Sequence, residues 1–535
     1  MKIERIGIAI GFGLVWVILV SIFFSALKVP SVLADGNTLT VCATGCDYGI
    51  IQDAIDAATD GDTIKIAEGT YTHVFSRAGV RQIAYISKTV TLQGGYSTAD
   101  WTSADPSAHP TILDAQNNGR GIYITDDSRA VIDGIRIING DAAGMRADGP
   151  DRLDGGGGIY IHRAYPTLQN TQIVSCAAQA GAGIFGYYGA ITVTNSDILS
   201  NMAETFGGAM RGFGTVINVQ NSLIANNVTT DAYSQGGGFY LTLCKPAIFS
   251  NNVISHNTAV QAAGGFMASS SDCTFTGNTI ANNNSTYSNG GGGFIVYSSC
   301  TFTDNIIKDN QAYYDGGAIG INARSTASFN NNFIENNTTG RYGGGLYIYS
   351  DATITLTDNI FRGNASTGGS SAGSAYALGN ALAIAGAHAN LWHNNFVNNQ
   401  GGLDIGIYVT DYTWGGTLYT GTLMLTNTIL ATQPTGIKVD NGNMVSMDGI
   451  LWYNVPVTVT QGITAIVSVQ HQSNGDPQFL TDGYHIPANS AARKQGVPSQ
   501  MGTDIDGEPF LNPPDVGVDQ YIFGEIYLPL IFRNG

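Results

Sequence analysis

Apolar and polar positions repeat along this chain with a period of about 27 residues between residues 155 and 397. Each repeat begins with a block of glycines and an apolar residue, and ends near an apolar anchor. The anchors are Ile173, Ile198, Ile224, Ile254, Ile280, Ile307, Ile334, Phe361 and Val397. Five residues before them stand Leu168, Val193, Val219, Phe249, Phe275, Phe302, Phe329, Leu356 and Trp392. We expect both series to stack as ladders in a core.

Polar residues keep the same register. Two positions before the anchors stand Thr171, Ser196, Ser222, Asn252, Asn278, Asn305, Asn332, Asn359 and Asn395, and three positions after them asparagine recurs from Asn201 to Asn364. Asparagine tolerates left-handed turns and can hydrogen-bond along a stack. Short strands with polar corners bury little alone, but they form a continuous core when stacked. The pattern predicts an all-β, right-handed parallel β-helix with a rise of about 4.8 Å per coil. A leucine-rich repeat is disfavoured because the Leu-x-x-Leu-x-Leu pattern is missing.

The segments outside the repeats predict two caps and a targeting signal. Residues 1–34 are interpreted as a signal peptide or signal anchor, because two basic residues precede an uncharged stretch, and cleavage is left open. Residues 35–114 are expected to form the N-terminal cap, with a short amphipathic helix near residues 48–58, and the first coils. Residues 115–470 are assigned to coils, and 471–535 to an irregular C-terminal cap and tail. This organisation predicts an extracellular or cell-surface protein.

Composition narrows the class of partner. The chain has 23 basic and 40 acidic side chains, which repel nucleic acid and anionic lipid. We therefore expect no nucleic-acid partner, and membrane contact only through the N-terminal segment if it is uncleaved. Cys42 and Cys46 can close a small loop. Cys273 and Cys300 should stack in adjacent coils, where the favoured interpretation is two buried thiols and a disulfide is the alternative.

Several motifs resemble known families. The stretch from Thr40 to Asp114 resembles the start of secreted bacterial pectin-lyase-like β-helix proteins. Gly-Gly-Ala-Ile at residues 316–319 and Phe-Thr-Asp-Asn at residues 302–305 resemble the GGA[ILV] and FxxN pairs of polymorphic outer membrane proteins. Segments at residues 476–479, 484–486, 504–507 and 515–519 resemble the closing segment of surface β-helices. The resemblance implies the fold rather than an activity, because this superfamily includes lyases, hydrolases and adhesins.

The strand after each glycine block carries the candidate ligand-binding residues. Its outward positions include pairs such as Tyr160 with His162 and Ile295 with Tyr297, and none of them is a carboxylate. The candidates are Tyr160, Tyr187, Arg211, Tyr240, Tyr297, Tyr347 and Tyr349. Rows of rings beside polar groups can stack on sugar faces or contact a protein surface, and packing against neighbouring loops is the alternative. We therefore expect binding or display, with adhesion to a polysaccharide or a cell-surface partner and without catalysis.

Charged side chains gather between Arg120 and Arg163, and they carry the alternative function. A polysaccharide lyase or glycoside hydrolase needs carboxylates, cations or Ca²⁺ at its site, and this region is where they cluster. Asp148, Asp151 and Asp154 can offer oxygens to Ca²⁺, but the alternating calcium-loop frame is missing. Solvated ion pairs are the favoured interpretation, so no cofactor and no catalytic residue are assigned. His162 has no carboxylate partner in register, which disfavours a nucleophilic triad.

Overall fold

The computed structural model describes residues 36–77, 79–148, 152–368, 377–499 and 502–522. The predicted signal segment, residues 1–34, and the last residues of the predicted tail lie outside the described residues. Within the described ranges, no helix has the length and apolar character needed to cross a bilayer.

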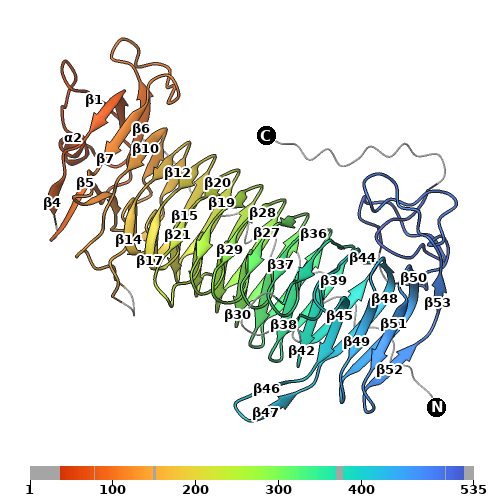
Figure 1. Cartoon of the computed structure of the whole chain (residues 1–535). Helices are drawn as coiled ribbons and strands as arrows, with labels where there is room; N and C mark the ends of the chain where they lie inside the picture. Colours follow the sequence, from red (N-terminus) through yellow and green to blue (C-terminus); the bar gives the residue numbers. More distant parts are fainter. Residues whose placement is uncertain (1–35, 78, 149–151, 369–376, 500–501, 523–535) are drawn as a thin grey trace, which may run out of the picture.

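The described chain is a right-handed parallel β-helix, as the repeat predicts (Figure 1). A representative coil consists of β27 (Asp272–Thr276), β28 (Thr279–Ala281), β29 (Asn284–Ser285) and β30 (Gly293–Val296). Each strand pairs in parallel with its counterpart one coil later, so β27 pairs with β31 (Ser299–Thr303). The stacked strands form faces that wrap a continuous core, and repetition lengthens the core without a new domain.

Aromatic and aliphatic ladders fill the core. Phe249, Phe275, Phe302 and Phe329 are fully buried, and successive ring centroids lie 4.7, 5.0 and 4.5 Å apart. These separations match the strand spacing, because each ring comes from the same position of the next coil. The core ladders predicted from the repeat are thus confirmed through this part of the chain.

Two buried ladders of polar side chains run along the corners. In the first, the Asn305 amide nitrogen donates to the side-chain oxygen of Asn332 at 2.9 Å, and Asn332 repeats the bond to Asn359 at 2.9 Å. The backbone N–H of each residue donates to the same oxygen, at 3.0 Å for Asn305. Toward the N-terminus, the backbone N–H groups of Thr171 and Ser196 donate instead to the hydroxyls of Ser196 and Ser222. The hydrogen-bonding role predicted for these corner positions is confirmed.

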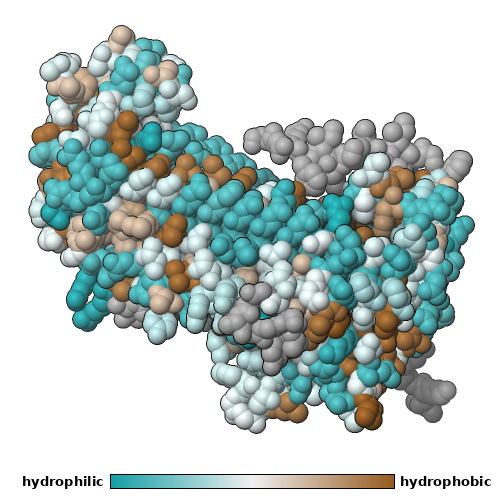
Figure 2. Space-filling view, viewed as in Figure 1, coloured by the Kyte–Doolittle hydropathy of each residue, from teal (hydrophilic) through white to brown (hydrophobic). Residues whose placement is uncertain are grey.

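The two ends of the solenoid are covered differently. At the N-terminal end, α2 (Ile51–Ala57) packs against β1 (Thr38–Val41) and β5 (Val80–Ile86), which confirms the predicted capping helix. At the other end, irregular chain after β53 (Gln472–Asn474) folds back along the flank of the last coils (Figure 1). Figure 2 shows hydrophilic residues over much of the middle coils. Exposed apolar side chains gather on the last coils, among them Met424, Met444, Ile463 and Ile466.

The structure corrects the register in the last regular repeat. Leu356 pairs with Leu391 and Phe361 pairs with Phe396, so the predicted positions Trp392 and Val397 are each one residue too late. Side chains alternate between the two faces of a strand, and a slip of one residue therefore exchanges core and surface. Asn394, rather than Asn395, continues the polar ladder, and accepts a hydrogen bond from the Asn359 backbone at 3.0 Å.

Two disulfides occur among the described residues, one in the N-terminal cap and one between adjacent coils. Cys42 and Cys46 close the small loop that their spacing suggested. Cys273 and Cys300 are also bonded, so the favoured interpretation of two free thiols was wrong. They face each other directly on β27 and β31 with Cα atoms 4.5 Å apart, which lies within the range that a disulfide spans. Cys176 and Cys244 are buried free thiols.

Candidate functional site

Most of the residues predicted to bind a ligand do stack in one column on successive coils, but most of this column is buried. Tyr160, Arg211, Tyr347 and Tyr349 are between 2 and 9% exposed. Their strands are β11 (Ile159–Ala164), β18 (Met210–Phe213) and β38 (Leu346–Tyr349). Tyr187 on β15 (Ile184–Thr194) and Tyr240 on β22 (Phe239–Thr242) are half-buried. These six residues share one face of the β-helix without forming an open row.

Tyr297 does not belong to this column. Met267 pairs with Phe294 and Ala268 pairs with Ile295, so Phe294 points outward and Ile295 points into the core. Tyr297 follows β30 in a left-handed turn with φ 50° and is 53% exposed. The expected outward pair of Ile295 and Tyr297 was wrong, because an extra glycine shifts the strand by one residue.

Cationic side chains lie against rings in the first half of the column. Arg211 lies 4.7 Å from the Phe206 ring centroid and 4.9 Å from that of Tyr240. Arg120 is fully buried, lies 4.6 Å from the Tyr160 ring and donates to the carbonyl of Gly155 at 2.9 Å. Such cation–π contacts satisfy the guanidinium groups inside the protein and stiffen this edge. For Tyr160 and Arg211, packing therefore accounts for what the structure shows.

Farther along the column the same face opens into a cavity of about 420 Å³, here named the tyrosine pocket. It is lined by Asn289, Asp315, Arg341, Tyr342, Tyr347, Tyr349, Ala383, Ala385, Tyr408, Thr410, Asp411 and Tyr412. Two alanines of β42 (Leu382–Ala385), Ala383 and Ala385, form the floor of the pocket. Ala383 pairs with Tyr347 on one side and with Tyr408 on the other, so a methyl group stands where neighbouring coils carry rings. The hollow forms because small side chains interrupt an aromatic column.

Aromatic rings form the walls of the pocket. Tyr347 and Tyr349 stack with centroids 4.6 Å apart, and Tyr412 meets Tyr349 edge-on at 5.3 Å. Tyr342 lies between two of the other rings, 5.7 Å from Tyr347 and 6.0 Å from Tyr408. Burial raises the pKa of Tyr347, Tyr349 and Tyr408 above the ordinary value of a phenol. The phenols therefore stay neutral at physiological pH and can donate hydrogen bonds.

An ion pair supplies the charged part of the wall. Arg341 donates through Nε to one oxygen of Asp315 at 3.0 Å and through Nη2 to the other. Asp315 is 2% exposed, and burial raises the pKa of its carboxyl while the Arg341 guanidinium opposes the shift. On the opposite side the Tyr408 hydroxyl donates to Asp440. Hydrogen bonds to carboxylates thus hold the side chains of Arg341 and Tyr408 in place, in addition to packing.

The composition of the pocket suits binding better than hydrolysis. Glycoside hydrolysis uses two carboxyl groups, one on each side of the scissile bond. Among the described residues that line the pocket, Asp315 and Asp411 are the carboxylates, and Asp315 is engaged by Arg341 on both oxygens. Flat rings with convergent amide, hydroxyl and guanidinium groups instead match the faces and hydroxyls of a sugar.

The charged region between Arg120 and Arg163 is dispersed by the fold. Arg120 is buried among aromatic rings, whereas Arg136 is exposed on β10 (Ile135–Ile138). His162 Nε2 lies 3.2 Å from Asp148, so this histidine has a carboxylate partner, although not one in the repeat register. Asp151 lies outside the described residues. The loop between β10 and β11 brings Asp148 to His162, and the repeat register does not cover that loop.

A groove of about 740 Å³ crosses part of the same region on another face. Asp133 and Arg136 line it beside Asn170, Gln172 and Asp197 from the following coils. Asp133 accepts from Asn170 at 2.8 Å, and Asp197 accepts from Gln172 at 3.0 Å. Both carboxylates therefore have amide partners and still line the groove. Of the sites described, this groove has the side chains that best suit the alternative enzymatic function.

Several lining residues of the tyrosine pocket were missed by the sequence reasoning. Asp315, Arg341, Tyr408 and Tyr412 come from turns or from coils beyond the regular repeats. Tyr412 belongs to an antiparallel hairpin, β46 (Tyr412–Trp414) with β47 (Thr417–Tyr419), that lies outside the parallel repeat. The signal available for Asp315 was its place directly before a glycine block, one repeat before Tyr342 at the equivalent position.

The comparison with protein families supports the fold. The family described as "Right handed beta helix region" matches residues 111–218 and 208–382, which together exceed half of the chain. No curated protein matches the sequence.

Among solved structures, pectate lyase Pel9A is 13% identical over 87% of this chain and 89% of its own, with a TM-score of 0.27. A mutant of the periplasmic alginate epimerase AlgG is 10% identical over 77% and 85%, with a TM-score of 0.33. A rhamnogalacturonan lyase is 12% identical over 90% and 96%, with a TM-score of 0.23. At such low TM-scores these structures carry no information about the activity of this chain.

Proposed function

This chain belongs to the right-handed β-helix family, and from that premise we propose that it is an extracellular or cell-surface protein that binds a glycan in the tyrosine pocket. The observation that carries the proposal is a cavity walled by five tyrosines, floored by two alanines and edged by the Asp315–Arg341 pair. Two disulfides support a location outside the reducing cytoplasm. Adhesion through the bound glycan is the activity that we infer.

The test measures glycan binding with the full chain and two matched variants. Polysaccharides of neutral and acidic classes are screened by affinity electrophoresis, and the best ligand is titrated by calorimetry. We expect Tyr412→Ala to weaken binding by about tenfold, because one stacking ring is worth about 0.5–1.5 kcal/mol. Tyr412 is half-buried and lies on a hairpin outside the core, so the fold should survive its removal.

Tyr187→Ala is the matched control, because Tyr187 lies on the same face but outside the pocket. Binding that is equally weakened in both variants would contradict the pocket as the site. Release of unsaturated or reducing ends from any polysaccharide would contradict a purely binding role.

A second function is supported by the groove that contains Asp133 and Arg136. Its carboxylate and guanidinium groups are the kind that polysaccharide cleavage requires. Turnover that disappears in Asp133→Asn while glycan binding in the tyrosine pocket persists would establish this alternative.

A further inference from the structure

The C-terminal cap, defined here as residues 475–499 and 502–522, covers one corner of the last coils (Figure 1). Each coil has a left-handed residue at this corner, directly before the ladder asparagine. Asp304 occupies the position in an uncovered coil and is exposed. Asp358 occupies it two coils later and is 2% exposed, because the cap packs over it. In the coil between them, Asn331 donates to the carbonyl of Ile505 in the cap at 3.4 Å.

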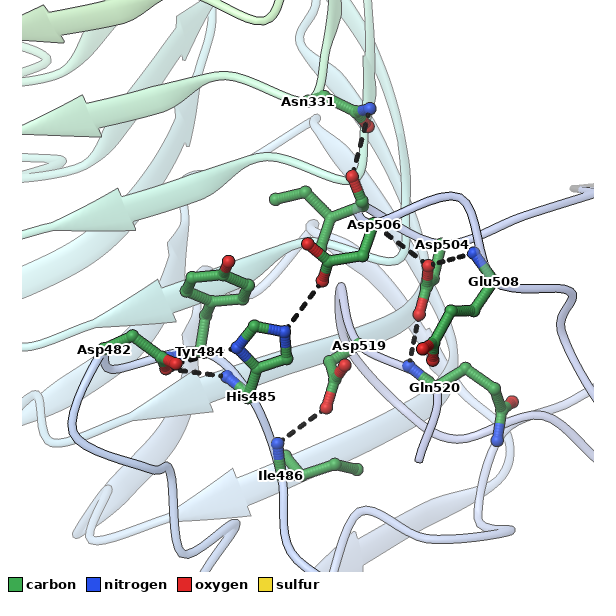
Figure 3. A network of polar contacts seen from close by, with 11 residues as sticks. Asn331, Asp482, Tyr484, His485, Ile486, Asp504, Asp506, Glu508, Asp519 and Gln520 are labelled. Carbon is green, nitrogen blue, oxygen red and sulfur yellow. Dashed lines mark hydrogen bonds and ion pairs between the residues drawn. The ribbon is translucent and has the colours of Figure 1, made fainter. Parts of the chain in front are cut away.

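Three carboxylates of the cap converge beneath this contact. Asp504, Glu508 and Asp519 each place a side-chain oxygen so that the three atoms lie within 4.8 Å of one another (Figure 3). Asp504 and Asp519 are 2 and 1% exposed. Calcium–oxygen distances are about 2.3–2.6 Å, so one ion can contact all three oxygens at once.

Two buried oxygen atoms at this place have no hydrogen-bond partner among the described residues. The first is Oδ1 of Asp519, whose other oxygen accepts from the Ile486 backbone at 2.6 Å. The second is Oδ1 of Asp358, which comes from the coil rather than from the cap. Asp358 stands between Asn331 and His393 in this corner column, and these two residues contact Ile505 at 3.4 Å and Gly517 at 3.2 Å, so the cap lies over Asp358 beside the cluster. Burial, and then the nearby negative charge of Asp504, raise the pKa of Asp358 to about 8. A buried carboxylate oxygen without a donor is costly unless a cation or a proton compensates it.

The histidine of the network cannot be the ligand. His485 Nδ1 lies 2.7 Å from Asp482, and His485 Nε2 lies 2.9 Å from Asp506 (Figure 3). A carboxylate only accepts hydrogen bonds, so both ring nitrogens carry protons and neither has a free lone pair. The atoms left for an ion are therefore all oxygens. Such a donor set favours a hard cation such as Ca²⁺ over zinc or copper.

We propose that Ca²⁺ binds between the C-terminal cap and the coils, held by Asp504, Glu508 and Asp519 with Asp358 on the coil side. Water and backbone carbonyls supply the other oxygens that Ca²⁺ requires. The ion neutralises carboxylates that would otherwise repel one another, and it joins two parts of the chain that are far apart in sequence. Its role is to fasten the cap over the corner, independently of any glycan in the tyrosine pocket.

The experiment uses the full chain after exhaustive treatment with a chelator. Thermal unfolding is followed while Ca²⁺ is added, with Mg²⁺ in a parallel series, because Mg²⁺ demands a tighter octahedral arrangement. We expect a saturable rise of the melting temperature by a few degrees with Ca²⁺ and a smaller response to Mg²⁺. Equilibrium dialysis should give one Ca²⁺ per chain.

Variants locate the ion. Asp519→Asn should remove the Ca²⁺ response, and Asp358→Asn, which changes the coil side alone, should weaken Ca²⁺ binding at least tenfold. Asp304→Asn is the matched control, since this residue holds the same corner position outside the cap, and it should keep the full response. If Asp519→Asn fails to fold, the Asp358→Asn result alone decides.

A spectroscopic probe tests the position directly. Tb³⁺ takes Ca²⁺ sites and emits when a nearby tyrosine is excited. Tyr484 is buried and lies close enough for the charges of Asp506, Asp482, Asp519 and Asp504 to raise its pKa, with burial the larger cause. Tyrosine-sensitised emission should appear with Tb³⁺, be displaced by Ca²⁺, and fall at least fivefold in Tyr484→Phe.

Three results would overturn the proposal. The first is the absence of both a Ca²⁺ response and Tb³⁺ emission. The second is a response that survives both Asp519→Asn and Asp358→Asn, which would place the ion elsewhere. The third is a cap that is equally stable with and without Ca²⁺ and strengthens only as the pH falls, because protons would then compensate the carboxylates.

Discussion

The middle coils and the C-terminal cap both bury polar side chains, but they satisfy them by opposite means. Asn305 in the coils receives bonds from Asn278 and gives bonds to Asn332, so each copy supports the next. The cap buries Asp504, Asp519 and His485, which have no repeated partner. An amide has both donors and an acceptor, whereas a carboxylate has acceptors only. Amides can therefore stack in any number, while stacked carboxylates repel and need a cation.

The difference explains where titratable groups occur in this molecule. In the asparagine ladders a carboxylate could still accept hydrogen bonds from the preceding residue, but it could not donate a side-chain bond to the next one. In the cap, backbone N–H groups serve as donors, as when Asp504 accepts from Asp506 at 3.0 Å and from Gln520 at 2.8 Å. Charge-dependent behaviour is thus expected from the cap and not from the ladders.

Placing a carboxylate in the ladder should produce the largest effect. We expect Asn305→Asp to lower the free energy of unfolding by about 3–5 kcal/mol at pH 7, because a fully buried negative charge would face the oxygens of Phe275 and Asn332 to which the Asn305 amide donates. The folded-state pKa of the new carboxyl is raised, so the charge penalty is complete above that pKa, shrinks as the pH falls through it, and is gone below about 4, where the unfolded carboxyl is protonated as well. Chemical denaturation at pH 7 and pH 4 measures both values.

Thr301→Ala is the control for this ladder variant, since Thr301 is exposed on the same coil and should change stability by less than about 0.5 kcal/mol. A penalty for Asn305→Asp that is equal at both pH values would show that shape, and not charge, explains the loss.

The cap should respond to pH where the ladders do not. Burial opposes the charge of His485, but hydrogen bonds to Asp506 and Asp482 prevail and raise its pKa from 6.5 to about 9. This stabilisation is complete below pH 6.5 and is lost as the pH rises through about 9. At about 1.4 kcal/mol per pKa unit, the loss is about 3.5 kcal/mol.

The buried carboxyls of the cap act in the same direction. Burial raises the pKa of Asp519 to about 7 and that of Asp504 to about 6, so their protonated forms favour the folded state and stability falls as the pH rises through these values. Hydrogen exchange of residues 482–499, corrected for its intrinsic pH dependence and measured with chelator, should show the cap loosening between pH 6.5 and 9. His485→Gln should remove the step near pH 9, and His256→Gln, an exposed histidine on the coils, should leave it unchanged.

The sequence alone predicts the ladders well because repetition exposes them. Phe302 and Asn305 recur at a constant offset, and a position that recurs in every coil must have the same environment in every coil. The prediction slipped by one residue at Trp392, where the ladder asparagine follows its predecessor by 35 residues instead of 27. It slipped again at Tyr297, where one added glycine moved the strand. Insertions change the register without changing the composition.

Features formed by the non-repeating segments could not be predicted from the sequence. The tyrosine pocket needs Ala383 between two rings and a hairpin that carries Tyr412, and neither follows from the period. The cap network brings Asp358 to residues 504–519, which are more than a hundred positions away. The sequence indicated that residues 476–519 form a closing segment. The role of their side chains is visible only in the structure, where the cap contacts the coil at Asp358. The likeness to polymorphic outer membrane protein repeats stays a prediction.

The smallest expected effect lies where the two regions meet. Lys308, Glu335 and Arg362 stand in register on successive coils, as their spacing predicts. Among the described residues, Glu335 pairs with Arg362 at 2.6 Å, and Lys308 makes no ion pair. Arg362 also donates to the carbonyl of Asp482 in the cap at 2.9 Å. The row thus contains one ion pair, Glu335 with Arg362, and Arg362 joins it to the cap.

The effect of a substitution in this row on the free energy of unfolding should depend on the contacts that the side chain makes. We expect Lys308→Met to change the free energy of unfolding negligibly and Glu335→Gln to lower it by about 0.5 kcal/mol, because the Arg362 side chain is 38% exposed and solvent weakens the pair. Arg362→Met should cost about 1 kcal/mol, since it also removes the bond to the cap. Denaturation at low and high salt measures the series, and only the Glu335 effect should vanish in salt. A cost for Arg362→Met no larger than that for Glu335→Gln would mean that the bond to Asp482 adds nothing, and that the cap is held by its own carboxylate cluster alone.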